Sequence, residues 1–77
     1  MSNSISLDTL KTLTEASSVR EFLVVPFRGG WCVRVRWGNQ EKPLRSQREP
    51  VRVFHTTDTA MKLLKKVGAQ TVTVVLA

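Results

Sequence analysis

Cysteine and histidine are nearly absent from this chain of 77 residues, which excludes several kinds of site. Cys32 is the only cysteine, so neither an internal disulfide nor a multi-cysteine metal site can form. His55 is the only histidine, whereas a zinc site usually needs about four Cys, His or carboxylate ligands. We therefore expect no metal and no cofactor, and a fold that depends on apolar burial alone.

The same scarcity limits catalysis. A nucleophile and its base would have to be Cys32 and His55, and no third group is evident to orient the histidine. The simpler interpretation is that Cys32 is a small strand residue and His55 a loop residue before a helix. Gly29 and Gly30 share one predicted turn, and Gly38 and Gly68 are separate turn or cap glycines, so no phosphate-binding glycine loop is predicted. We expect a protein that binds and does not catalyse.

Long apolar runs are missing as well. No stretch approaches the roughly 20 apolar residues that span a bilayer, and the N-terminal residues mix polar side chains with isolated aliphatics, unlike a signal peptide. The expected location is the cytoplasm, with no membrane partner. Hydrophobic residues still make up 42% of the chain, which is typical of a globular protein. We expect one domain over residues 1–77, with residues 1–4 loose.

Basic residues are plentiful and unevenly distributed. The net charge is +6, and residues 20–52 hold eight cations against three acids, which is +5. Seven of those eight cations are arginine, the residue suited to bidentate contacts with phosphate or carboxylate.

Local patterns predict an α+β fold in the order α-β-β-β-α-β. Ser6 is expected to cap a first helix of about three turns, Thr56 or Thr57 a second, and Gly68 to end the second. Strands are predicted at residues 22–27, 31–37, 44–48 and 71–76, with residues 51–54 extended again, as a separate strand or as part of a bent one. The simplest packing places both helices on one face of a mainly antiparallel sheet, so that the other face is free to bind a ligand.

The arginines give the most informative functional pattern. Arg34 and Arg36 alternate with apolar residues and must share one sheet face. If neighbouring strands place Arg45 or Arg52 there, with Arg48 nearby, these cations would converge on one surface that suits nucleic acid, with duplex DNA favoured. The alternative interpretation is an ordinary solvated face, with the arginines partly paired with Glu21, Glu41 and Glu49.

Other interpretations of the aromatic and basic residues stay open. Trp31 and Trp37 could stack on bases, but they share the face of Val33 and Val35 and are expected in the core. Three lysines of the second helix either extend the basic surface or interact with the helix dipole; they are Lys62, Lys65 and Lys66. The Arg face could instead bind an acidic protein partner, or an edge strand could pair two copies in a homodimer.

A family resemblance accompanies these patterns. Leu44-Arg45-Ser46-Gln47-Arg48, Arg52-Val53-Phe54 and Asp58-Thr59-Ala60, followed by Leu64 and Gly68, resemble the small plasmid partition-associated proteins of the ParC type, which are unrelated to the topoisomerase subunit of that name. Residues 7–13 and 18–22 also resemble the start of that family. The resemblance implies a mobile-element accessory protein without an enzymatic role, and it assigns no binding residue.

Overall fold

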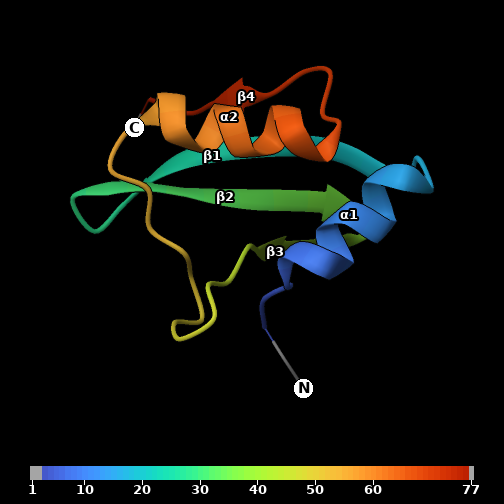
Figure 1. Ribbon diagram of the computed structural model, residues 1–77, viewed down its shortest axis with the longest axis horizontal. Helices are drawn as coiled ribbons and strands as arrows, with labels where there is room; N and C mark the ends of the chain where they lie inside the picture. The colour runs from blue at the N-terminus through green and yellow to red at the C-terminus, as the bar shows by residue number, and fades with distance from the viewer. Residues whose placement is uncertain (1–2, 77) are drawn as a thin grey trace.

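The computed structural model describes residues 3–76, and its elements follow the predicted order (Figure 1). They are α1 (Leu7–Glu15), β1 (Val19–Phe27), β2 (Gly30–Trp37), β3 (Gln40–Pro43), α2 (Thr57–Val67) and β4 (Thr73–Val74). Residues 1–4 were expected to be loose. Met1 and Ser2 lie outside the described residues, whereas Ser4 differs from that expectation because it is only 8% exposed.

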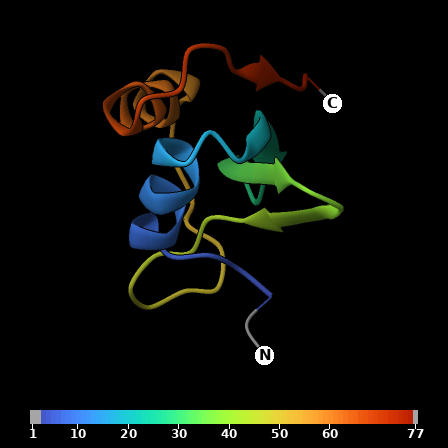
Figure 2. The same ribbon diagram turned by 90° about the vertical axis from the view of Figure 1, so that its right-hand side faces the viewer.

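The described strands form one sheet with the order β3-β2-β1-β4. β1 and β2 pair antiparallel, as do β2 and β3, whereas β4 runs parallel to β1. Figure 2 shows α1 and α2 together on one side of this sheet. The α+β prediction, with both helices on one face of a mainly antiparallel sheet, is confirmed.

Local capping signals explain where the helices begin and end. The side chain of Ser6 accepts a hydrogen bond from the Thr9 amide at the start of α1, and Thr56 does the same for Thr59 in α2. Gly68 ends α2 with φ of +113°, a left-handed conformation that favours glycine. All three residues occupy the roles that the sequence predicts.

The core lies between the helices and the sheet. The apolar stripes of the sequence predict eight residues in one core. Four of them are fully buried: Leu10, Val33, Val35 and Leu64. The other four are only partly buried and pack against the edge of the core: Leu13, Leu63, Val72 and Val74. Both tryptophans also pack there, partly buried. The rest of this buried cluster consists of Ile5, Phe22, Val24, Leu44, Phe54 and Ala60.

The third strand lies earlier than predicted. A tight turn at Gly38, with φ of +53°, lets pairing with β2 begin at Gln40, so β3 is complete at Pro43. Leu44 makes a single bridge to Ile5, and residues 45–53 form a loop on the helix side of the sheet (Figure 2). The predicted strand at residues 44–48 is therefore wrong.

Phe54 is the one residue of the predicted extended segment 51–54 that pairs with a described strand. Its backbone exchanges two hydrogen bonds with Trp31, with N···O distances of 2.7 and 2.8 Å. A Cβ atom on the neighbouring Gly30 would lie 2.5 Å from the Phe54 carbonyl oxygen, so this approach requires glycine. The last strand is also shorter than predicted, because β4 pairs with β1 only at Leu23 and Val24.

Replacing Leu64 with alanine should destabilise the protein by about 2–5 kcal/mol, because Leu64 is 0% exposed and the change leaves a cavity under α2. Urea unfolding followed by circular dichroism measures this loss. Leu76→Ala is the matched control, since Leu76 is 84% exposed and should change stability by less than about 0.5 kcal/mol. Equal effects of the two variants would contradict the described core.

Candidate nucleic-acid interface

An ion-pair network crosses the sheet face that the helices leave uncovered. The register sets Arg36 of β2 opposite Glu21 of β1 and Glu41 of β3. Arg36 Nη1 lies 2.9 Å from Glu21 Oε1, and its Nη2 lies 2.8 Å from Glu41 Oε1. Arg34 Nε lies 2.7 Å from Glu41 Oε2. Thr73 of β4 donates a hydrogen bond of 2.9 Å to Glu21, which extends this open-face network to the far edge.

The network balances the charge of the two arginines. Arg34 and Arg36 share one face, as strand alternation predicts, but each pairs there with a carboxylate. Hydrogen bonds from Arg34 and then Arg36 lower the pKa of Glu41, and the hydrogen bond with Glu41 raises the pKa of Arg36. Glu41 is therefore ionised near neutral pH and competes with any phosphate for these guanidinium groups.

The other arginines of the predicted site lie elsewhere. The Arg52 guanidinium carbon lies 4.9 Å from the centre of the Phe54 ring, and that ring belongs to the core beneath the helices. Arg52 is thus on the helix side, opposite Arg34 and Arg36. Arg45 and Arg48 lie in the loop beyond β3 and line a hollow together with Arg52. The structure brings together Arg45, Arg48 and Arg52, and it does not bring them to the open sheet face.

A side-chain turn shapes the loop that carries these arginines. The Ser46 hydroxyl accepts hydrogen bonds from the amides of Arg48 and Glu49, at 3.3 and 2.9 Å. The Ser46 amide in turn donates to the Glu49 carbonyl oxygen, at 3.1 Å, and the Arg52 amide donates to Leu44 at 2.9 Å. Because its backbone bonds to itself and to the end of β3, the loop holds its arginines in a defined arrangement.

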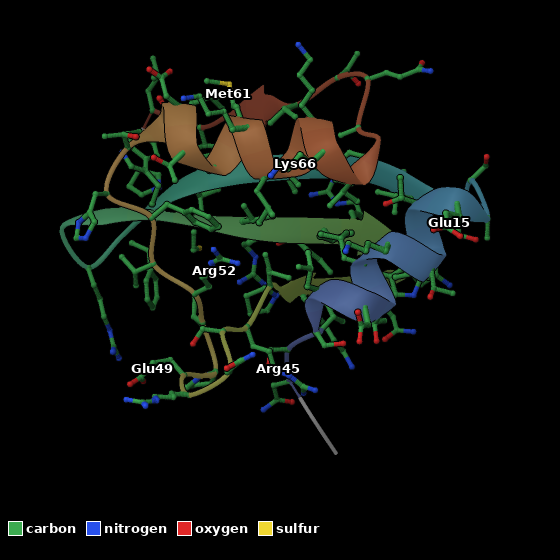
Figure 3. The ribbon with its side chains drawn as sticks, viewed as in Figure 1. Glu15, Arg45, Glu49, Arg52, Met61 and Lys66 are labelled. Atoms are coloured by element: carbon green, nitrogen blue, oxygen red, sulfur yellow. The ribbon has the colours of Figure 1, made fainter. Side chains whose placement is uncertain are left out.

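A second hollow lies between this loop and α2, and we call it the basic groove. Arg52 approaches from the loop and Lys66 from α2, as Figure 3 shows. Its lining residues are Arg52, Phe54, Thr59, Lys62, Leu63, Lys65 and Lys66. Arg52 lines both hollows, so the two form one continuous basic surface, in which Glu49 is the one acidic residue among the described lining residues.

The charge of the helix side is not balanced as it is on the open face. No Asp or Glu lines the basic groove within the described chain, and among residues 3–76 neither Arg52 nor the three lysines forms an ion pair. Residues 44–67 hold six cations against two acids, a net charge of +4 out of the total of +6. The potential of this side is therefore the one that attracts a polyanion.

The two residues weighed for catalysis differ in exposure, although each follows one residue of the bridge between Trp31 and Phe54. Cys32 is 2% exposed, on the open face of β2, and burial raises the pKa of its thiol. His55 is exposed in the loop before α2. Within the described residues, no three His, Cys, Asp or Glu side chains gather where they could hold a metal. Neither α1 nor α2 has the length and apolar character needed to cross a membrane.

Comparison of the chain with known protein families, curated proteins and solved structures finds no match. The resemblance to ParC-type partition proteins stays a hypothesis.

Phe54 and Leu63 line the basic groove but were not predicted from the sequence as site residues. Both fit the pattern of core residues, and Phe54 is indeed only 3% exposed. The one available signal was the spacing of Arg52 and Phe54, because residues two apart in an extended segment point to the same side.

Acidification should weaken the open-face network and lower stability. In the unfolded chain Glu41 titrates at its ordinary pKa of about 4.3. Since the folded-state pKa is lower, its stabilising contribution is full above that value and is lost as pH falls through the folded-state pKa. The Glu41→Gln variant should therefore lose less stability between about pH 5 and about pH 2 than the wild type.

Urea unfolding at several pH values measures the difference. Glu15→Gln is the control, because it removes the same charge from the exposed end of α1. If Glu41→Gln and Glu15→Gln both lose as much stability on acidification as the wild type, the network contributes nothing to stability.

Proposed function

We propose that this protein binds nucleic acid, without catalysing a reaction, through the continuous basic surface formed by residues 45–52 and α2. The observation that carries the proposal is the separation of charge. Arg34 and Arg36 are held by two carboxylates, whereas Arg52 and the lysines of α2 rim a groove without an acidic lining residue in the described chain. Such a rim suits phosphates, whose bound counterions are released when the cations replace them.

The proposal moves the expected interface from the open sheet face to the helix side. Arg45, Arg48 and Arg52 remain its binding residues, and Lys62 and Lys66 join them from α2. Arg34 and Arg36 instead hold the sheet face together with Glu21 and Glu41.

The resemblance to ParC-type proteins is compatible with this role. Two of the segments that carry it, residues 44–48 and 52–54, contain all three loop arginines of the proposed interface. We propose that the chain is an accessory protein of a plasmid or other mobile element.

An acidic protein partner is the second candidate for the same surface. The observation that favours it is the apolar part of the groove at Leu63, which a hydrophobic side chain of a partner could contact while its carboxylates contact the lysines. Binding of nucleic acid with the salt dependence described below distinguishes the first candidate from the second.

Removing two cations from the groove should weaken the salt dependence of binding. The test titrates the protein with duplex DNA, single-stranded DNA and RNA over a salt series. Each phosphate contact on duplex DNA contributes about 0.9 to the slope of log affinity against log salt, so Arg52→Gln with Lys66→Gln should reduce its magnitude by up to about 2. Circular dichroism confirms that the variant is folded.

The matched control is Arg34→Gln with Arg36→Gln, which removes the same charge from the open face and should change the slope much less. Equal losses in both double variants would refute the location of the interface. Absence of binding to any of the three nucleic acids at low salt, where electrostatic attraction is strongest, would refute the function.

Replacing Cys32 with alanine and His55 with glutamine should leave binding within about two-fold of the wild type, because neither side chain lines the basic groove. The same oligonucleotide titration measures this. A large loss of affinity in both variants, with folding retained, would reopen a role for these two residues.

A further inference from the structure

The basic groove has an apolar floor beneath its cationic rim. Leu63 of α2 supplies the accessible part of this floor, because Phe54 is only 3% exposed and lies beneath Arg52, while Lys62 and Lys66 stand on the rim. Phosphate alone needs cations and gains nothing from an apolar surface. A ligand that fits the whole groove therefore combines negative charge with an apolar, flat group.

Arg52 presents a flat cation at the edge of this floor. Its guanidinium carbon lies 4.9 Å from the centre of the Phe54 ring, so one side of the group is covered and its orientation is held. Phe54 itself is only 3% exposed and has no ring surface left for a ligand. The stacking surface that this pair offers to a ligand is thus the outer side of the Arg52 guanidinium.

We propose that the groove binds single-stranded nucleic acid, with one unstacked base lying on the outer side of Arg52 beside Leu63 and the flanking phosphates on Lys62, Lys66 and Arg48. This inference rests on the proposed function and names its ligand. Bases stack on arginine planes when they are splayed from a single strand, whereas a duplex keeps its bases paired and stacked and presents phosphates to a protein surface. A duplex would leave the apolar floor unfilled.

The sharpest test separates the base from the phosphate. Fluorescence anisotropy compares four labelled ligands: strands of thymidine and of uridine about 12 nucleotides long, an abasic strand with the same number of phosphates, and a duplex of that length. The wild type should bind at least one base-bearing strand about five-fold or more tightly than the abasic strand, since stacking adds to phosphate contacts.

Arg52→Lys is the decisive variant, because it keeps the charge and removes the flat group. It should bring the ratio of base-bearing to abasic affinity close to one and leave binding to the abasic strand nearly unchanged. Arg28→Lys is the matched control: Arg28 also covers a phenylalanine ring, Phe27, at 5.2 Å, but it lies in the turn between β1 and β2 and does not line the groove. It should keep the wild-type ratio.

Each outcome decides a different question. A wild-type ratio near one, or equal ratios in Arg52→Lys and Arg28→Lys, overturns the base site and leaves nucleic-acid binding through phosphate intact. Duplex binding as tight as that of the base-bearing strands also overturns the inference. If none of the four ligands binds at low salt, the proposed function fails as well.

Discussion

The backbone pairing of Phe54 with Trp31 is the constraint on which the arrangement of the helix side depends. These two hydrogen bonds tie the end of a long loop to the first residues of β2. They direct the Phe54 ring into the core, which places Arg52 over that ring and starts α2 at the Thr56 cap two residues later. Gly30 makes the approach possible, because a side chain there would meet the Phe54 carbonyl oxygen.

Ion pairing, more than composition, determines which face of this protein has unbalanced positive charge. Both faces contain arginine, yet strand register brings Glu21 and Glu41 against Arg36 on the open face. The helix side receives its cations from a loop and from α2, whose first turn contains Asp58 and whose last turn contains Lys65 and Lys66. That order follows the helix dipole, which favours acids at the N-terminus and cations at the C-terminus. One arrangement therefore stabilises α2 and concentrates positive charge beside Arg52.

Features that depend on a few neighbouring residues could be predicted from the sequence. The caps at Ser6, Thr56 and Gly68 and the alternation through β2 are of this kind, and they suffice for the α+β order. The position of β3, the face of Arg52 and the partners of Arg34 could not be predicted, because each depends on register or on a contact between distant segments. The single bridges of Leu44 and Phe54 leave no periodic signal in a sequence.

The parallel pairing of β4 with β1 also imposes an order of assembly. β1 and β2 are joined by a two-residue turn and can pair as soon as both exist, since closing a short loop costs little entropy. During synthesis, the residues of β4 follow those of β3, the loop and α2, so β4 can pair with Leu23 and Val24 only at the end. Until then, the outer edge of β1 stays open to water or to another chain.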